Sequence, residues 1–348
     1  MDLFKLKVAV AMLGLLLCGA CTDQNRDVVA FLMPDQGSTR YDERDFPAFK
    51  AELAELCPGC TVIYQNANGD ADLQQQQFSA ALIQGARVVV LDPVDSSAAA
   101  ALVTYGHSQD VKVIAYDRPI PDVRADYYIS FDNEALGYLL SSSLVEHLKA
   151  SGVPEGAGVL QINGSPTDAA AGLIRDGIHR GLRGSGYRTL AEFDTPDWKP
   201  TEAQQWTAGQ ITRFGNEIRG IAAANDGTGG GAIAALKAAG VDPLPPVSGN
   251  DAVIAALQRI IAGDQYNTIS KPSEIVAAAA ARAAVKLLNG ETPEPNTTLY
   301  DTPSELYMPV VVTRDNLKAE IFDSGILKVE QVCTPEYAEP CKAIGLRD

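Results

Sequence analysis

Short apolar segments alternate with segments of helical spacing along most of this chain. The largely apolar runs 28–32 and 87–91, for example, are each followed by a stretch with helical spacing. Strands that alternate with helices pair in parallel, because each helix returns the chain to the same end of the sheet. The pattern therefore predicts an α/β protein whose parallel sheet is covered by helices on both faces.

The alternation stops near residue 131 and begins again near residue 158, which predicts two halves of about 130 residues each. The first half contains predicted strands at 28–32, 62–64, 87–91, 111–116 and 127–131 and predicted helices at 46–56, 72–83 and 96–108. The second contains predicted strands at 158–162, 189–193, 218–224, 247–249 and 266–269 and predicted helices at 168–182, 200–213, 229–239, 252–262 and 272–288. One more apolar strand is expected at 308–313.

The first residues of the chain have the features of a bacterial lipoprotein signal. Lys5 and Lys7 precede an apolar run over 8–17, which is too short to span a bilayer. Small residues follow this run and end directly before Cys21. We therefore expect residues 1–20 to be removed as a signal peptide and Cys21 to carry the lipid.

Lipidation of Cys21 implies that residues 21–27 are a polar tether and that the protein is held outside the cytoplasmic membrane, on the cell surface or in the periplasm. Cys18 is the alternative lipid site, and it is disfavoured because Leu17 before it is not a small residue. A simple secretory signal without a lipid is the second alternative.

The chain is acidic, with a formal net charge of −16. Removal of residues 1–20 takes away Lys5, Lys7 and Asp2, a net +1, and leaves −17. A surface this negative repels phosphate backbones, so we expect no nucleic-acid partner. The hydrophobic share of 46% is ordinary for a globular protein. We also expect the protein to be a monomer.

The cysteines outside the signal region form two close pairs. These are Cys57 with Cys60 and Cys333 with Cys341, and the natural interpretation outside the cell is two local disulfides. A redox role for the first pair is disfavoured, because it follows a predicted helix instead of starting one. The three histidines are scattered without ligand spacing, so neither a metal site nor a cofactor is expected.

Polar residues follow most of the predicted strands. Ligands of open parallel sheets bind beyond the carboxyl ends of the strands, where such residues would gather, although some polar residues there only cap the next helix. The strand ends are Met33-Pro34-Asp35, Gln65-Asn66, Asp92-Pro93, Asp117-Arg118, Asp132-Asn133, Asn163-Gly164-Ser165, Asn225-Asp226 and Asn250-Asp251.

A set of Asp, Asn, Arg and Lys with few aromatic rings suits a neutral polyol, because carboxylates accept hydrogen bonds from neighbouring hydroxyls and cations donate to oxygens. Two enzyme interpretations compete with simple binding. Asp117 and Asp226 are a carboxylate pair for glycoside hydrolysis. The glycine run 227–231 suits a phosphate cradle, but it lacks a Walker lysine, follows an acidic residue, and is more typical of a tight strand-to-helix turn.

At these strand ends the sequence resembles the periplasmic sugar-binding proteins of ABC transporters, and specifically their xylose-binding branch. The resemblance covers residues from about 28 to 315. The segments that carry it are Arg40-Tyr41, 64–68, Tyr116-Asp117-Arg118, 128–134, Gly164-Ser165-Pro166 with Asp168, Asn225-Asp226 with 230–233, Ser248-Gly249 with Asp251, and Lys271-Pro272.

The resemblance implies the type I periplasmic binding protein fold, with two doubly wound parallel-sheet lobes joined by a three-strand hinge. The implied crossings lie near Asn133, Lys271 and Val310–Val312. The implied domains are 28–132 with 271–307, 133–270 with 308–332, and a disulfide-stapled tail at 333–348.

The resemblance also implies a ligand site. Asp117 and Arg118 would clamp hydroxyls, Trp198 would stack on the sugar ring, and Tyr41 would form a second wall. Asn133 is expected near the hinge and Asp226 as a helix cap. The implied ligand-binding residues are Arg40, Tyr41, Asp117, Arg118, Asp168, Trp198, Asn225, Asp251 and Lys271.

Each nominated residue has a plainer alternative role. Trp198 would cover the edge of the core, Lys271 would be a solvated hinge residue, Arg118 would pair with a surface acid, and Asp251 would cap a helix. Close xylose binders usually carry asparagine where this chain has Ala170, so a different pentose, a hexose or another polyol remains open.

The Arg40 region also matches the pattern loosely. Phe46 and Pro47 follow Asp45, whereas a basic residue is common at this point in the xylose-binding branch. This departure likewise leaves the identity of the sugar open.

The implied function is capture of a neutral monosaccharide, xylose or a related pentose, by closure of the lobes, followed by delivery to an ABC transporter permease without catalysis. The alternatives are a sugar sensor that presents its closed form to a membrane receptor, and a glycoside hydrolase that uses Asp117.

Overall fold

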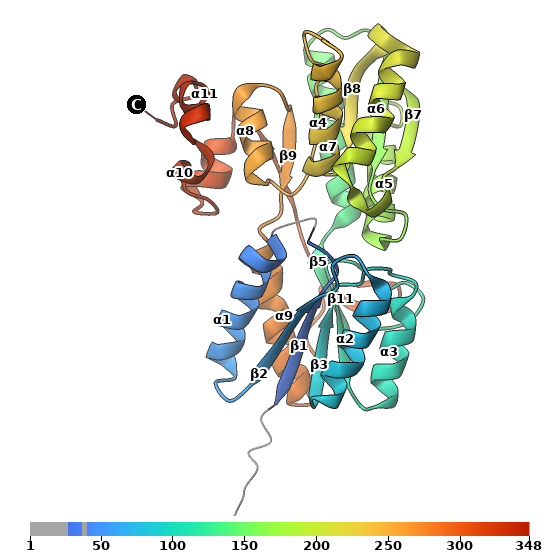
Figure 1. Ribbon diagram of the computed structural model, residues 1–348, viewed down its shortest axis with the longest axis vertical. Coiled ribbons are helices and arrows are strands. Elements are labelled where there is room, and N and C mark those ends of the chain that lie inside the picture. The colour runs from blue at the N-terminus through green and yellow to red at the C-terminus, as the bar shows by residue number, and fades with distance from the viewer. Residues whose placement is uncertain (1–26, 37–39, 348) are drawn as a thin grey trace, which may run out of the picture.

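The computed structural model describes residues 27–36 and 40–347 and has two lobes, one above the other in Figure 1. The predicted signal peptide and Cys21 lie outside the described residues. Within the described residues, no helix combines the length and apolar character needed to cross a membrane.

The first lobe contains a seven-stranded sheet in the order β10-β11-β5-β4-β3-β1-β2. Neighbouring strands are parallel except for the β10–β11 hairpin. The strands are β1 (Val28–Met33), β2 (Thr61–Asn66), β3 (Ala86–Leu91), β4 (Lys112–Tyr116), β5 (Tyr127–Phe131), β10 (Thr297–Leu299) and β11 (Thr302–Tyr307).

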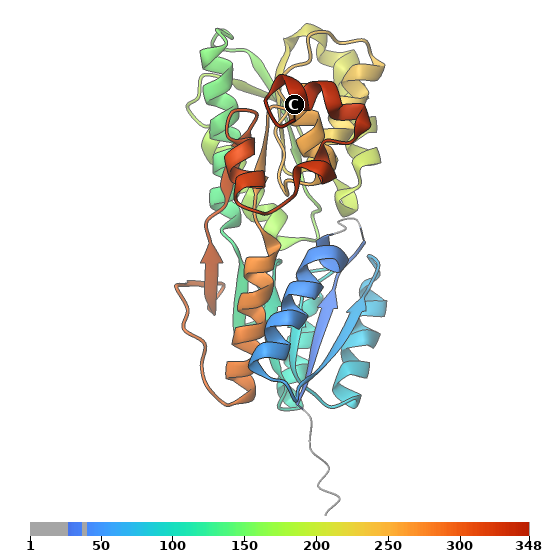
Figure 2. The same cartoon turned by 90° about the vertical axis from the view of Figure 1, so that its left-hand side faces the viewer.

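Helices cover both faces of this sheet. α1 (Phe46–Leu56) and the alanine-rich α9 (Ser273–Leu288) pack on one face, and α2 (Ala71–Ile83) and α3 (Ala99–Ser108) pack on the other. Figure 2 shows α9 beside α1 along the lower lobe, although the two helices are more than 200 residues apart. The strand residues Phe31, Val90 and Ile129 are fully buried between the helix layers, as expected for a sheet covered on both sides.

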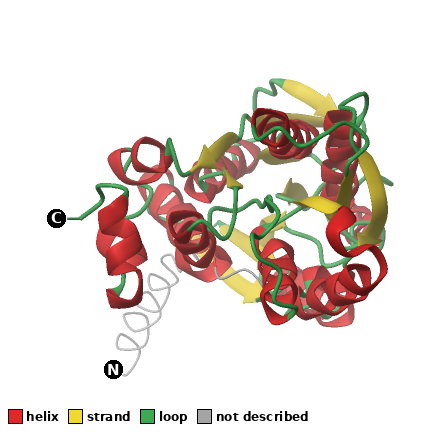
Figure 3. Cartoon of the chain, turned by 90° about the horizontal axis from the view of Figure 1, so that it is seen from above, coloured by secondary structure: helices red, strands yellow, loops and turns green. Residues whose placement is uncertain are grey.

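The second lobe contains the parallel strands β7 (Arg188–Asp194), β6 (Gly158–Asn163) and β8 (Ile218–Ala223), in this order across the sheet. A separate antiparallel pair joins β9 (Asn267–Ser270) and β12 (Val310–Thr313). The surrounding helices are α4 (Asn133–Ala150), α5 (Ala169–Leu182), α6 (Pro200–Phe214), α7 (Asp226–Ala238) and α8 (Ile254–Ala262). Figure 3 shows the molecule from above, with helices packed beside the central strands and other strands at the outer edge.

Three segments connect the lobes: the step from β5 to α4, the step from β9 to α9, and the step from β11 to β12. The first and third lie side by side, because the Asp132 N–H donates to the Tyr307 carbonyl over 2.9 Å. The predicted α/β architecture with two lobes and a three-strand hinge is confirmed.

Several local predictions are wrong. The 18-residue α4 was not expected, although Leu136, Leu140, Leu144 and Leu148 are spaced four apart on its buried face. The expected strand 247–249 is a single bridge between Val247 and Ile221. The strands β10 and β11 were not expected either, and the strand predicted at 308–313 begins only at Val310.

The glycine run was expected to form a turn that leads into a helix from residue 229, whereas the helix already begins at Asp226. Residues 227–231 lie inside the first turns of α7, after the cap residue Asn225. A Cβ atom at Gly231 would lie 2.2 Å from the Pro200 carbonyl oxygen, so the glycine lets α7 pack closely on the start of α6. The run therefore serves helix packing in this structure.

The C-terminal tail packs against α8. The tail helices α10 (Val329–Val332) and α11 (Ala338–Ala343) contact α8, and the Cys333–Cys341 disulfide lies buried in their shared core. Cys57 and Cys60 form the second disulfide, between the end of α1 and the start of β2. Both predicted disulfide pairs are confirmed.

Candidate functional site

A cavity of about 470 Å³ lies between the two lobes, at the carboxyl ends of their strands. Its lining includes every one of the nine residues nominated from the sequence. They come from Arg40 beside the short helix after β1, Asp117-Arg118 after β4, Asp168 after β6, Trp198 after β7, Asn225 after β8, Asp251 before α8, Lys271 after β9, and Tyr41 beside Arg40.

Asp117 lies at the centre of one group of charges. Its carboxylate is 2.5 Å from Nη2 of Arg40 and 3.9 Å from Nζ of Lys271. Burial alone would raise the pKa of Asp117, but Arg40, Lys271 and Arg118 outweigh burial and lower it below its usual value of 3.8. At neutral pH Asp117 is therefore an ionised hydrogen-bond acceptor at the cavity wall.

The backbone of Asp117 has the unusual φ of 58°. The hydroxyl groups of Tyr128 and Ser130 both donate to its carbonyl oxygen, each over 2.8 Å. A left-handed non-glycine residue persists only where its surroundings hold it in place, and such residues concentrate at ligand clamps. Trp198, Asp251 and Ala252 also line the cavity and also have positive φ.

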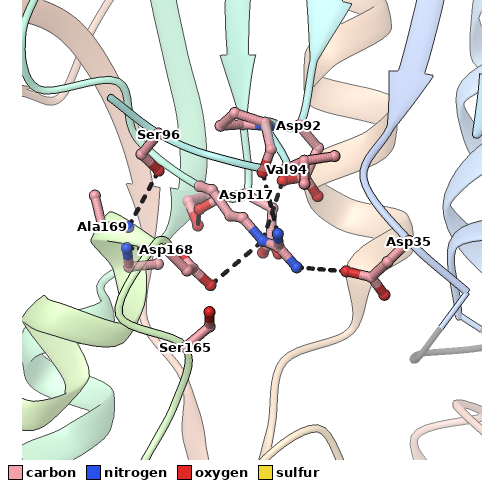
Figure 4. A network of polar contacts seen from close by, with 12 residues as sticks. Asp35, Asp92, Val94, Ser96, Asp117, Ser165, Asp168 and Ala169 are labelled. Atoms are coloured by element: carbon pink, nitrogen blue, oxygen red, sulfur yellow. Dashed lines mark hydrogen bonds and ion pairs between the residues drawn. The ribbon is translucent and has the colours of Figure 1, made fainter. Parts of the chain in front are cut away.

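Arg118 lies at the centre of a second group of charges, which spans both lobes. Figure 4 labels its partners Asp35, Asp92 and Asp168. Its guanidinium is 2.7 Å from Asp35 and 3.6 Å from Asp92 in the first lobe, and 3.3 Å from Asp168 in the second. Two of these three partners, Asp92 and Asp168, are buried and are therefore not surface acids. The plainer role of Arg118, pairing with a surface acid, therefore fails.

The carboxylates around Arg118 are costly to bury. Burial raises the pKa of Asp92 well above its ordinary value, and Arg118 offsets this only in part. Burial raises the pKa of Asp168 in the same way. Neither oxygen of Asp92 has a hydrogen-bond partner among the described residues. The charged form of the Asp92 carboxylate is therefore stabilised mainly by the nearby Arg118 guanidinium.

The Lys271 side chain is only 9% exposed, and it joins the hinge to the cavity. The Nζ atom of Lys271 is 3.2 Å from the Asp251 carboxylate. Asp251 does not cap α8, because the cap position is Val253. Burial lowers the pKa of Lys271, but Asp117 and Asp251 outweigh burial and leave it raised. The alternative of a solvated hinge lysine is therefore wrong.

Trp198 and Tyr41 supply the aromatic surface. The indole N–H of Trp198 donates to Asp168 over 3.0 Å, and the ring packs directly over Gly164. Tyr41 is almost fully buried, and the Arg40 guanidinium carbon lies 4.7 Å from its ring centroid. Trp198 is therefore the more accessible of the two aromatic walls.

Asn225, and not Asp226 as expected, is the cap residue of α7. The Asn225 side-chain oxygen accepts from the Thr228 N–H and caps α7. The side-chain amide N–H groups of Asn225 are therefore the donors that remain for a ligand in the cavity. Asp226 is the first residue of the helix, is buried, and accepts from Gln265 and Thr268. It is absent from the cavity lining, so it cannot pair with Asp117 for hydrolysis.

The sequence interpretation missed several lining residues. Asp35 and Asn250 stand at strand ends that had been noted, and Asn133, expected only near the hinge, lines the cavity at the start of α4. The Asn250 side-chain oxygen is buried without a hydrogen-bond partner in the described part of the chain. The strand-end signal could have found all three, whereas Glu43, Arg44, Asp197, Lys199 and Leu327 had no such signal.

The cations of the cavity are already paired. Arg40, Arg118 and Lys271 each contact at least one carboxylate. Behind the lining, Asp45 and Asp92 add two more carboxylates. A ligand therefore meets many acceptors and paired cations, which is an arrangement for hydroxyl groups more than for an anion.

A two-lobed α/β protein with a polar cavity at the hinge has the architecture of a solute-binding protein. The family model described as "Periplasmic binding protein domain" matches residues 29–292. The chain belongs to the periplasmic binding protein family.

Its relatives include the D-xylose-binding periplasmic protein of Escherichia coli, 36% identical over 83% of this chain and 87% of that protein. The multiple sugar-binding periplasmic receptor of Rhizobium radiobacter is 29% identical over 88% of this chain and 93% of that protein. Among solved structures, a solute-binding protein from Clostridium phytofermentans with bound β-D-glucose aligns with a TM-score of 0.80 at 25% identity, covering 88% and 100% of the two chains.

Proposed function

We propose that this protein captures a neutral monosaccharide between its lobes and releases it unchanged. The observation that carries the proposal is the cavity itself, in which carboxylates from both lobes meet paired cations and an indole ring. Carboxylates accept hydrogen bonds from sugar hydroxyls, and the Trp198 ring offers a face for the sugar's C–H groups. A ligand that bonds to both lobes favours their closure through its differential affinity.

Xylose or a related pentose is the proposed sugar, on the strength of the xylose-binding relatives. Ala170 lines the cavity and offers no polar group, so the site has one side-chain amide fewer than the resemblance would lead one to expect. The same family includes a structure with bound glucose and another with bound myo-inositol. A panel of pentoses, hexoses and polyols is therefore the appropriate test.

We further propose that the protein acts as a lipid-anchored monomer outside the cytoplasmic membrane and delivers the sugar to an ABC transporter permease. Cys21 would carry the lipid. Residues 28–132 with 271–307 and 133–270 with 308–332 would be the moving lobes, and 333–348 would remain fixed to the second. The sensor alternative differs only in the membrane partner that receives the closed form.

The function predicts a selective thermal shift. One neutral monosaccharide at a concentration about 100 times its Kd is expected to raise the free energy of unfolding by about 2.7 kcal/mol and Tm by several degrees. Glucuronate, which has the size of a hexose and a negative charge, should give no shift, because the cavity cations are paired. A shift with glucuronate alone, or none across the panel, would contradict the proposal. Turnover of labelled glycosides would favour a hydrolase instead.

The wall formed by Trp198 predicts a steric effect at Gly164. An alanine Cβ there would lie 2.0 Å from the Trp198 ring, so the indole must move. We expect Gly164→Ala to weaken sugar binding by about tenfold or more, because overpacking of this kind costs about 1–3 kcal/mol. Titration calorimetry gives the affinity, and Gly172→Ala is the matched control, since nothing lies within 4 Å of a Cβ at Gly172. Equal effects of the two substitutions would argue against the role of Trp198.

A further inference from the structure

The loop after β3, residues 92–98, contacts the second lobe directly, away from the cavity. Ser96 in this loop is only 2% exposed, and its N–H donates to the Thr167 carbonyl over 3.0 Å. Its hydroxyl oxygen accepts from the Ala169 N–H over 3.1 Å, as Figure 4 shows. None of residues 92–98 lines the cavity.

The partner of Ser96 is the first turn of α5. A helix leaves its first N–H groups without partners inside the helix, so side chains or water must satisfy them. Asp168 accepts from the Ala170 N–H over 2.8 Å and thus caps the helix from its own chain segment. The Ala169 N–H is satisfied from the opposite lobe, by Ser96.

The loop that holds Ser96 is fixed on its own side. The Gln74 side chain, buried on α2, donates to the Asp92 carbonyl and accepts from the Val94 N–H, each over 2.8 Å. Arg118 donates to the Pro93 carbonyl over 3.1 Å. The loop therefore presents Ser96 from a rigid base, and Arg118 touches both this loop and Asp168.

We propose that Ser96 is a positioning residue that holds the two lobes in register. It caps α5 across the lobe boundary and thereby favours the arrangement in which Asp168 faces Arg118. The cap is available only when the lobes are together, because separation would leave the Ala169 N–H to water. Ser96 therefore favours closure without touching the ligand.

The effect on sugar affinity rests on the proposed function. Ser96→Ala removes the hydroxyl and keeps the backbone bond to Thr167. The substitution is expected to lower the affinity for every sugar that binds by the same factor, about 3 to 10. This factor corresponds to the contribution of a single hydrogen bond. Ser96→Thr keeps a hydroxyl and should restore the affinity. Ser97→Ala is the matched control, since Ser97 is an exposed neighbour in the same loop.

A second measurement does not need the sugar. Amide hydrogen exchange of a peptide covering residues 167–172 in the ligand-free protein should be faster in Ser96→Ala than in the wild type and in Ser97→Ala. Ser96→Trp should hold the lobes apart, because the site of Ser96 has almost no free surface. Small-angle X-ray scattering would then show no compaction on addition of sugar.

Two outcomes would overturn the role of Ser96. One is wild-type affinity together with wild-type exchange in Ser96→Ala. The other is a changed ratio of affinities between sugars, which would mean that Ser96 contacts the ligand. If the wild type binds no sugar, the proposed function fails, and the exchange of residues 167–172 alone decides the role of Ser96.

Discussion

Replacement of Asp117 by alanine is expected to abolish the rise in Tm that the bound sugar produces. Asp117 is the ionised acceptor between Arg40 and Lys271, and a hydrogen bond to a charged group contributes about 1.5–3 kcal/mol. Loss of two such bonds to sugar hydroxyls would raise Kd by about 100-fold or more.

The substitution should leave the fold intact. Arg40 keeps its bond to Asp45 over 3.1 Å, and Lys271 keeps Asp251, so neither cation is left buried without a partner. Circular dichroism and the Tm of the ligand-free protein check this point. Asp122→Ala, at an exposed position of the same lobe, is the control. An unchanged Kd in Asp117→Ala would remove Asp117 from the site.

Replacement of Arg118 by methionine is expected to have the largest effect on the ligand-free protein. Three carboxylates, those of Asp35, Asp92 and Asp168, would lose the guanidinium that lies among them. Removal of one partner from a buried ion pair costs about 3–5 kcal/mol, because the remaining charge is left uncompensated. Sugar binding should be lost, since Arg118 also holds Asp168 in place across the lobes.

The pH dependence gives this prediction a distinct signature. Burial already raises the pKa of Asp92 and Asp168 in the wild type, and loss of the Arg118 charge should raise both further. A carboxyl with a raised pKa in the folded state binds its proton more tightly folded than unfolded, so it destabilises the fold as pH rises through that pKa. The Tm deficit of Arg118→Met should therefore shrink as the pH falls from 8 towards 4.

The control for this experiment is Arg124→Met, which removes an exposed arginine of the same lobe. It should melt close to the wild type at every pH. A variant at Arg118 that melts at the wild-type temperature at neutral pH would show that the buried carboxylates do not depend on this guanidinium.

Much of this architecture could be predicted from periodicity and strand ends. The apolar runs of β1 and β3 are short and continuous, as is typical of strands covered on both faces. The polar residues after them converge because parallel strands share one carboxyl edge. This is why the nine nominated residues line one cavity.

The remaining features depend on contacts that local patterns do not encode. The segment of α4 contains three consecutive serines, which lower its intrinsic helix propensity. Its spaced leucines stabilise the helix by packing on α5 and β8, a contact that the local sequence does not reveal. Asp35 had appeared as a strand end without an assigned partner, and its pairing with Arg118 spans 83 positions of sequence. Ser96 carried no signal, because its role arises from the opposite lobe.

We expect the C-terminal tail to make the ligand site sensitive to the redox state of its surroundings. Leu327, a few residues before the tail, lines the cavity and packs against the core that holds the tail on α8, which includes the fully buried Cys333–Cys341 bond. In a reducing compartment that bond is absent, and the tail loses its cross-link beneath one wall of the cavity. We therefore expect newly made chains to gain full affinity only after they have been exported and oxidised.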